Sequence, residues 1–309
     1  MDGSDGMLAA PITQALGAVA LTLGAAAAAR RLVLRRGGIA RLGFEAAANR
    51  IAGPDDTICI IDFDRTITDG SSAQCHDVIG AGAIMPTAIH AGFGPLLDFS
   101  KPEKVLKGDA WWYRANELLL EHARDVLTPE SVTSLALAAP LFGTSTQPMR
   151  LRDGAASLLS QLDELNVPVL IVSAGFTEVI QAFLQANRVP LGRNVRVCSN
   201  RLVFASGRLH AIEPTPPITG YNKHMTYERN REWFEAHPTR RSLLVVGDSL
   251  GDLKCAEGVP ADYRVTSVGI FNEADGRSTV EQYEEAFTAV VVGNGGSLKP
   301  VYDLVVGRR

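Results

Sequence analysis

The stretch that decides the fold is Thr57-Ile58-Cys59-Ile60-Ile61-Asp62-Phe63-Asp64, a short apolar run that leads into two carboxylates. Its length and its β-branched residues are typical of a strand that is buried on both faces of a parallel sheet. Residues 168–172 and 242–246 repeat this pattern, and each run again leads directly into polar residues. We expect three buried strands whose carboxyl ends carry the chemistry of the protein.

Weaker strand candidates alternate with helical periodicity on either side of these runs. The strand candidates are residues 195–198, 202–205, 264–270 and 289–292, and the helical segments are 154–165, 177–186 and 226–236. Strands that alternate with helices indicate a parallel sheet with right-handed crossovers. The predicted fold class is therefore α/β, with a Rossmann-like parallel sheet as its core.

Residues 72–147 interrupt this alternation, because they contain no strong strand pattern. Residues 107–124 and 129–138 have helical periodicity instead, and Trp111, Trp112 and Tyr113 are adjacent in the first of these segments. An insertion of this length directly after the first strand is too long for an ordinary loop. We expect a mostly helical cap at 72–147 and a catalytic core at 51–71 and 148–309.

Residues 1–50 differ in charge from the rest of the chain. They hold six Arg and three acidic residues, a net charge of +3, whereas the whole chain of 309 residues carries −4. Residues 7–29 are uncharged and rich in alanine, and four arginines follow within 30–36. Their length suits a membrane span with the basic flank on the cytoplasmic side. A targeting segment or a surface extension fits the same composition, so all three interpretations stay open.

The composition excludes several classes of function. The mildly acidic chain offers no basic face for a nucleic acid polymer. Four cysteines are too few for a disulfide scaffold, which indicates a reducing compartment and a cytoplasmic catalytic part. No His or Cys lies in the three strand-end clusters, which argues against zinc. We expect a monomer that acts on a small molecule.

Four carboxylates are expected to meet at the strand ends: Asp62, Asp64, Asp248 and Asp252. They would raise one another's pKa values unless a cation neutralised them, and Mg²⁺ prefers such oxygen ligands. Backbone N–H groups and the Ser173 hydroxyl would add donors that suit a phosphoryl group. One carboxylate can attack phosphorus while a second handles a proton. A single Asp after a strand is usually a cap or turn residue, but three such clusters favour a site.

These residues resemble the motifs of the haloacid dehalogenase-like hydrolase superfamily. Residues 62–66 resemble its first motif, DxDxT, Ser173 resembles the second, and residues 247–252 resemble the fourth. Lys223 is the best candidate for the third, a lysine. Shorter matches at 75–79, 151–154, 172–176, 199–200, 222–224 and 247–254 resemble the pyrimidine 5'-nucleotidase family, also called cytosolic 5'-nucleotidase III.

The resemblance implies a Mg²⁺-dependent hydrolase of nucleoside 5'-monophosphates, with pyrimidine bases as the expected substrates. It implies that Asp62 attacks phosphorus to form an aspartyl-phosphate and that Asp64 handles the proton. It also implies which groups bind the metal and the phosphate. The metal would be held by Asp62, the backbone carbonyl of Asp64, Asp248 and, in support, Asp252; the phosphate would be bound by Ser173, the Ala174 backbone and Lys223.

The cap departs from the family pattern. The family reads the base partly through a cap glutamate, whereas this chain offers Asp98 at the aligned place. A family serine after the aromatic pair corresponds to Asn116. We therefore expect Trp112 to stack on the base and Asn116 to contact it, although core packing is the alternative role for these aromatic residues.

Three alternatives remain open at this point. The enzyme would be a phosphatase for another small phosphate ester, or it would transfer the phosphoryl group to a second nucleoside instead of water. Outside the enzyme class, the chain would be a membrane-tethered binding protein on an inactive enzyme fold. The filled catalytic positions favour an enzyme.

Overall fold

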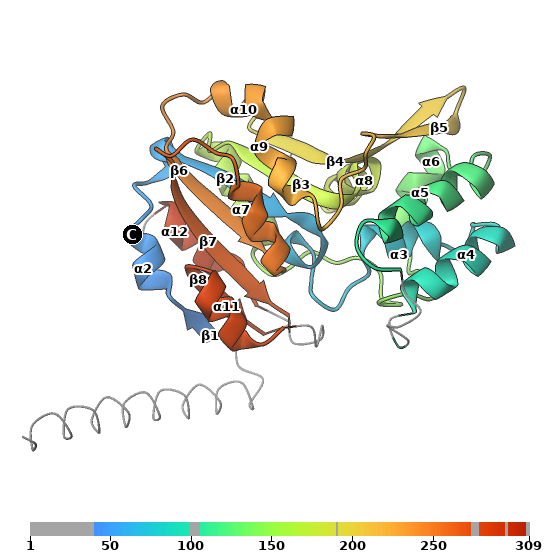
Figure 1. The fold of residues 1–309 in the computed structure, drawn as a ribbon, viewed down its shortest axis with the longest axis horizontal. Coiled ribbons are helices and arrows are strands. Elements are labelled where there is room, and N and C mark those ends of the chain that lie inside the picture. The colour runs from blue at the N-terminus through green and yellow to red at the C-terminus, as the bar shows by residue number, and fades with distance from the viewer. Residues whose placement is uncertain are drawn as a thin grey trace, which may run out of the picture. The chain divides into compact units, whose positions relative to one another are not determined.

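The computed structural model describes residues 40–98, 100, 106–189, 191–272, 278–293 and 296–306 (Figure 1). The uncharged segment 7–29 lies outside the described residues, so its three interpretations stay predictions. No helix in the part of the chain that the structure describes is long and apolar enough to cross a membrane.

An eight-stranded sheet organises the core. Its strands are β1 (Ala40–Leu42), β2 (Thr57–Asp62), β3 (Val169–Phe176), β4 (Val195–Ala205), β5 (Arg208–Glu213), β6 (Ser242–Gly247), β7 (Arg264–Phe271) and β8 (Ala289–Val292). Their order across the sheet is β1-β8-β7-β6-β2-β3-β4-β5. The pairings from β8 to β4 are parallel, and β5 is antiparallel to β4. The predicted α/β class with a parallel sheet is confirmed.

β2 lies between β3 and β6 in this sheet. Asp62 is in register with Val172 of β3, and Ile61 is in register with Val246 of β6. The chain continues from β2 to β3 on one side and reaches β6 on the other side, so the strand order reverses at β2. The carboxyl ends of strands beside such a switch point form the usual ligand crevice of open α/β sheets.

The alternation of side chains in β2 explains why both faces of the sheet are covered. Cys59 and Ile61 pack into one hydrophobic cluster, and Ile58 and Ile60 pack into a second cluster on the opposite face. All four are fully buried, as expected for the all-apolar runs from which these strands were predicted.

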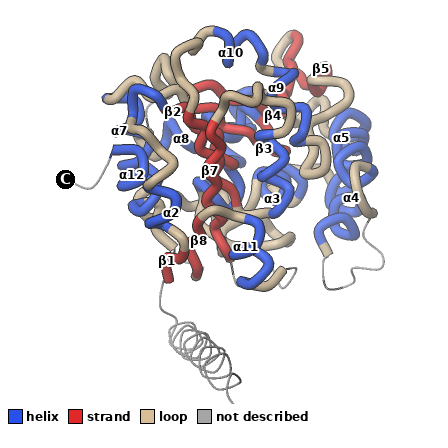
Figure 2. The backbone as a smooth tube through the Cα atoms, turned by 60° about the vertical axis from the view of Figure 1, so that its left-hand side comes forward, coloured by secondary structure: helices blue, strands red, loops and turns tan. Residues whose placement is uncertain are grey.

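Helices cover both faces (Figures 1 and 2). The larger cluster takes residues from α7 (Ala155–Glu164), α8 (Thr177–Ala186) and α12 (Lys299–Val306). The smaller cluster takes residues from α10 (Arg231–Glu235), beside α9 (Thr226–Arg229). Among the described residues outside the insertion, the other helices are α2 (Phe44–Ala48) and α11 (Val280–Ala286). Short helical turns lie at Pro54–Asp56, Lys223–Met225 and Leu250–Ala256, and a wide turn lies at Phe63–Ile67.

The segment between β2 and β3 is helical. Before α7 it contains α3 (Cys75–Gly80), α4 (Thr87–Leu97), α5 (Ala110–His122) and α6 (Pro129–Leu137), and no strand among its described residues. The insertion is mostly helical, as expected, and its separation from the core as a cap with limits at 72 and 147 stays a prediction. The backbone N–H of Leu209 in β5 donates to the carbonyl of Arg124 at 3.2 Å, so the β4–β5 hairpin contacts the end of α5.

Two sequence predictions differ from the structure in detail. The strands expected at 195–198 and 202–205 are one strand, β4, because Ser199 and Asn200 continue the extended backbone. The single helix expected at 226–236 is two, because Asn230 leaves helical geometry at φ −123°. Its side chain donates to the Thr226 carbonyl at 2.9 Å, which is the local competition that breaks helices at Asn.

Candidate active site

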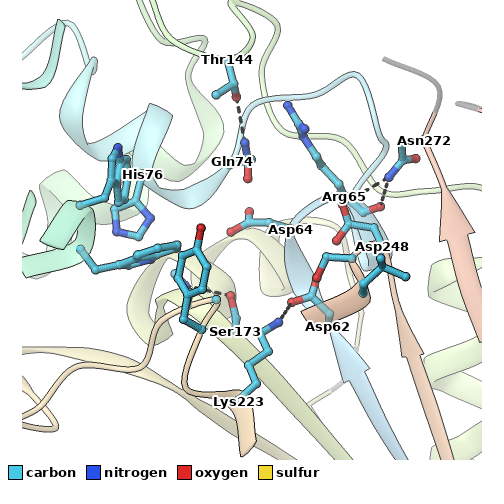
Figure 3. A pocket seen from close by; sticks show the side chains of 18 of the residues that line it. Asp62, Asp64, Arg65, Gln74, His76, Thr144, Ser173, Lys223, Asp248 and Asn272 are labelled. Carbon is cyan, nitrogen blue, oxygen red and sulfur yellow. Dashed lines mark hydrogen bonds and ion pairs between the residues drawn. The ribbon is translucent and has the colours of Figure 1, made fainter. Parts of the chain in front are cut away.

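A pocket of about 510 Å³ opens where the carboxyl ends of β2, β3 and β6 meet. Asp62 is the last residue of β2, Ser173 lies in β3, and Asp248 follows β6 directly. Figure 3 shows these side chains converging on the pocket. Its lining also includes other predicted site residues, namely Asp64, Trp112, Ala174 and Lys223. The volume is within the range of small-molecule sites.

The chain turns immediately after Asp62, so Asp62 and Asp64 do not share one face of a strand. Residues 63–67 form a wide turn closed by the Thr68 N–H on the Phe63 carbonyl at 3.1 Å, and Asp64 and Arg65 within it have non-helical backbone angles. Asp64 reaches toward the helical insertion, where its Oδ1 accepts a hydrogen bond from the Cys75 backbone N–H at 2.9 Å. A Cβ on Gly175 would lie 2.6 Å from Cys75 Sγ and 3.2 Å from Asp64 Oδ2, so only glycine fits beside this contact. The two carboxylates therefore have separate surroundings.

Lys223 is the cation of the site. It lies in the one-turn helix that follows the loop after β5, and its Nζ donates to Asp62 Oδ1 at 2.6 Å and to Asp252 Oδ1 at 2.5 Å. Burial alone lowers the pKa of the ammonium, but the charges of Asp252 and Asp62 outweigh burial and raise it well above its usual value. Lys223 is therefore a permanent positive charge next to Asp62.

Asp62, Asp248 and Asp252 form an all-oxygen cluster in which one carboxylate oxygen of each lies within 4.8 Å of the others. This donor set fits Mg²⁺, which takes oxygen ligands and keeps several waters. Asp252 is already engaged through both oxygens, because its Oδ2 accepts from the Ser249 N–H at 2.8 Å and hydroxyl at 2.9 Å. Asp62 and Asp248 line the pocket and could bind the metal directly, whereas Asp252 does not line it and would support the metal and its waters from behind.

Burial dominates the acid–base character of the first two carboxylates. Burial raises the pKa of Asp62 to about 7 against the opposing charge of Lys223, and a bound divalent cation would lower that pKa again. Burial also raises the pKa of Asp64 to about 6, although the Cys75 N–H stabilises the charged form. A carboxyl with such a pKa can hold a proton close to neutral pH, which an acid catalyst needs.

The segment 173–175 is shaped to present donors to the pocket. The Ser173 hydroxyl accepts from the Gly175 N–H at 3.0 Å, and the register of β3 against β4 shifts between Val172 and Phe176. Asn200, fully buried in β4, donates to the Ala174 carbonyl at 2.8 Å and to the Ile218 carbonyl at 2.9 Å. Asn200 thus ties the Ser173 segment to the loop that leads to Lys223.

The insertion supplies the far side of the pocket. Trp111 and Trp112 line it from α5, and Tyr221 meets Trp112 edge-on with ring centroids 5.8 Å apart. His76 lines it from α3 and packs on Trp111 at 4.8 Å, and burial lowers the pKa of its imidazole to about 3. His76 is therefore neutral there.

Two cap residues from the sequence predictions, Asp98 and Asn116, do not line the pocket. Asn116 is buried in α5, and neither it nor Asp98 is among the described residues that line the pocket. The contact of Asn116 with a base therefore stays a prediction.

Sequence reasoning missed Arg152 and Asn272. Asn272 lines the pocket directly after β7, and Arg152 is buried beneath the turn that follows Asp62. The strand-end rule, applied to β7, would have identified Asn272. Arg152 gave no signal beyond its place in a short family match, because a buried arginine cannot be distinguished from an exposed one by its neighbours in sequence.

A parallel sheet with an acidic cluster and a buried lysine at its switch point, beneath a helical insertion, defines the class of haloacid dehalogenase-like phosphatases. Within this class, the family model "Pyrimidine 5'-nucleotidase (UMPH-1)" matches residues 96–306, more than half of the chain. The chain therefore belongs to the pyrimidine 5'-nucleotidase family, and it is a phosphomonoester hydrolase of the nucleotidase type. The resemblance stated from the motifs is confirmed, and the non-catalytic alternative is removed.

Individual relatives agree with this assignment. A 7-methylguanosine phosphate-specific 5'-nucleotidase of Drosophila melanogaster is 28% identical over 261 residues, which cover 78% of this chain and 77% of the relative. The enzyme of the same name from Gallus gallus is 30% identical over 163 residues, which cover 53% of this chain and 52% of the relative.

Solved structures share the fold. Cytosolic 5'-nucleotidase IIIB bound to cytidine superposes with a TM-score of 0.64 at 23% identity, covering 85% of this chain and 89% of that chain. A phospho-aspartyl intermediate analogue of phosphoserine phosphatase superposes with a TM-score of 0.51 at 14% identity, covering 80% and 98%. At these identities, the likeness extends to the fold only.

Proposed function

We propose that the protein is a Mg²⁺-dependent, cytoplasmic 5'-nucleotidase that hydrolyses nucleoside 5'-monophosphates through an aspartyl-phosphate on Asp62. The observation that carries this proposal is the position of Lys223, whose ammonium bridges Asp62 and Asp252 beside Asp248. The buried ammonium, together with a cation held by the acidic cluster, would stabilise the negative charge of a phosphoryl group next to Asp62.

The first step transfers the phosphoryl group to the protein. An oxygen of Asp62 attacks phosphorus and the bond from phosphorus to the ribose O5' breaks. Asp64, protonated with its raised pKa, gives its proton to the departing nucleoside oxygen. Lys223, the Ser173 hydroxyl and the Ala174 N–H hold the phosphate oxygens.

The second step hydrolyses the aspartyl-phosphate and regenerates the free Asp62 carboxylate. Asp64, now a carboxylate, takes a proton from a water molecule that attacks phosphorus, and the bond from phosphorus to Asp62 breaks. Phosphate leaves and Asp64 is again protonated, so protons balance over the cycle. A magnesium ion held by Asp62, the Asp64 carbonyl and Asp248, with Asp252 in support, would neutralise charge on the phosphoryl oxygens.

We consider two classes of base as substrates, and the first is the pyrimidines of the family name. The second is 7-methylguanine, the base named for the Drosophila and chicken relatives. The pairing of Trp112 with Tyr221 favours testing it, because a cationic methylated base stacks well on indole. The proposed phosphoryl transfer to Asp62 is the same for both classes of base.

The test is phosphate release from a panel of substrates with and without Mg²⁺. The panel contains cytidine, uridine and 7-methylguanosine 5'-monophosphates, and a sugar phosphate. We expect hydrolysis of a nucleotide that depends on Mg²⁺ and is lost in Asp62→Asn. Preference for the sugar phosphate would contradict the nucleotide assignment, and near-normal turnover by Asp62→Asn would contradict the mechanism.

A further inference from the structure

The turn after β2 holds one residue in an uncommon backbone conformation. Arg65 lies between Asp64 and Thr66. Its φ is +62°, in the left-handed region that non-glycine residues seldom adopt. Such a conformation persists only where the surroundings hold it in place, and it is often found at functional sites.

Both peptide groups of Arg65 are held by side chains. Its N–H donates to the Thr68 hydroxyl at 2.7 Å, which fixes the peptide plane that also contains the Asp64 carbonyl. Its own carbonyl accepts two hydrogen bonds, from Arg152 Nη2 at 2.5 Å and from Asn272 Nδ2 at 3.0 Å. These hydrogen bonds therefore fix the backbone that directly follows Asp64.

The Arg152 guanidinium contacts two successive carbonyls of the turn. Its side chain is almost fully buried, and its Nε donates to the next carbonyl of the turn, that of Thr66, at 2.8 Å. Its Nη1 donates to the Gly296 carbonyl at 3.1 Å. Because the guanidinium is a rigid planar fork, it reaches two successive carbonyls at once, which a single lysine nitrogen does not reproduce.

Asn272 links this contact to the acidic cluster. Its Oδ1 accepts from Arg152 Nη2 at 2.9 Å, and its Nδ2 lies 3.4 Å from Asp248 Oδ2 as well as on the Arg65 carbonyl. Figure 3 shows Asn272 above Asp248, next to the Arg65 backbone. Segments that are far apart in sequence thus converge on one carbonyl oxygen.

We propose that Arg152 and Asn272 are positioning residues for proton transfer by Asp64, because they hold the Arg65 carbonyl and with it the turn that directs Asp64 toward the leaving group. The inference rests on the acid role of Asp64 in the proposed function. Neither side chain needs to touch the substrate for this role.

The leaving group of the substrate separates positioning from general damage. A nucleoside oxygen needs a proton as it departs, whereas p-nitrophenolate leaves readily without one. The value of kcat/KM reports the steps up to departure of the first product, so water attack does not enter it. Loss of acid positioning should therefore lower kcat/KM for a nucleotide and spare that for p-nitrophenyl phosphate.

Because Asn272 also contacts Asp248, the experiment compares kcat/KM for both substrates at saturating Mg²⁺ in full-length Asn272→Ala, Arg152→Lys and Asp64→Asn. We expect the first two to lose about 100-fold with the nucleotide, since small misplacements of a catalytic group cost that much. With p-nitrophenyl phosphate we expect about threefold or less, the same selectivity as Asp64→Asn. The matched control is Arg150→Lys, an exposed arginine paired with Asp69, which should leave both values unchanged.

The outcomes are distinguishable. Equal losses on both substrates, or no loss, in folded Asn272→Ala would overturn the inference while Asp64→Asn still discriminates. If Asp64→Asn itself shows no discrimination, the acid role and the proposed mechanism fail together. Circular dichroism verifies folding, and Asn272→Ala decides if Arg152→Lys does not fold.

Discussion

The ammonium of Lys223 lies 2.6 Å from Oδ1 of Asp62, although 161 positions separate the two residues in the chain. The contact joins the central strand β2 to a one-turn helix that follows the only antiparallel pairing among the described strand pairs. It places a fixed positive charge against the carboxylate that we propose as the nucleophile. The electrostatics of the site depend on this contact.

Replacing the cation should therefore damage both catalysis and stability. In Lys223→Met, we expect kcat/KM for a nucleotide to fall by roughly 100- to 1000-fold, the usual loss when one preorganised electrostatic group is removed. We also expect unfolding free energy to fall by about 3–5 kcal/mol, because Asp62 and Asp252 stay buried without their partner. Steady-state kinetics and urea denaturation measure the two effects. Lys254→Met, at an exposed position, is the control, and equal effects in both variants would contradict the assignment.

Gly175 should tolerate no side chain. The Cβ of Gly175→Ala would meet Cys75 Sγ at 2.6 Å and Asp64 Oδ2 at 3.2 Å, so α3 or Asp64 must move. We expect kcat/KM to fall by about 10- to 100-fold. Gly94→Ala is the matched control, because nothing lies within 4 Å of its new Cβ, and a helical Ala should leave activity unchanged. A Gly175→Ala enzyme with normal kinetics would show that the contact with Asp64 has no functional weight.

The raised pKa of Asp64 predicts the pH profile. The acid must be protonated in the first step, and its pKa is raised to about 6 by burial, so nucleotide kcat/KM should fall as pH rises through about 6. Kinetics between pH 5 and 8 with a nucleotide and with p-nitrophenyl phosphate test this. The profile for the second substrate should lack this limb, and an identical limb for both would assign it to a group other than Asp64.

His76 should make stability fall at low pH. Its pKa is lowered by burial from 6.5 to about 3, so below pH 6.5 the unfolded chain binds a proton that the folded chain does not. The contribution is present above 6.5 and is lost as pH falls toward 3. Between pH 7 and 5 we expect about 2 kcal/mol less stability from this residue.

The comparison of wild type with His76→Phe isolates the His76 contribution, because Asp62 and Asp64 act with the opposite sign. Their pKa values are raised on folding, so their protons favour the folded state at low pH, in both proteins alike. Urea titrations at the two pH values should show a smaller loss in His76→Phe. Parallel losses in the two proteins would refute the prediction.

Much of the site was predictable because it sits where strands end. Asp62, Ser173 and Asp248 follow apolar runs that are legible in sequence, and parallel strands bring such ends to one edge. Lys223 required the family motif, because its segment has no periodicity and its partners come from other elements.

The residues that sequence did not reveal are those whose roles depend on tertiary contacts. Arg152 is held in its buried position by acceptor groups from distant segments, and none of these is visible from its neighbours in sequence. For the same reason, the helical pattern of 107–124 could not show that Asn116 is buried in α5 and does not line the pocket. The break at Asn230 is caused by one side chain that bonds to the backbone, and a hydrophobic pattern taken over the whole segment does not reveal it.

The most direct test of the central claim is to look for the phosphoryl group on Asp62. The enzyme is mixed with a nucleotide that carries a radiolabelled 5'-phosphate, quenched in acid within the first turnover, digested and analysed by mass spectrometry. We predict label on the peptide that contains Asp62, none in Asp62→Asn, and loss of the label during a chase with unlabelled nucleotide. Rapid phosphate release with no labelled peptide at any quench time, or label on a different residue, would contradict the account.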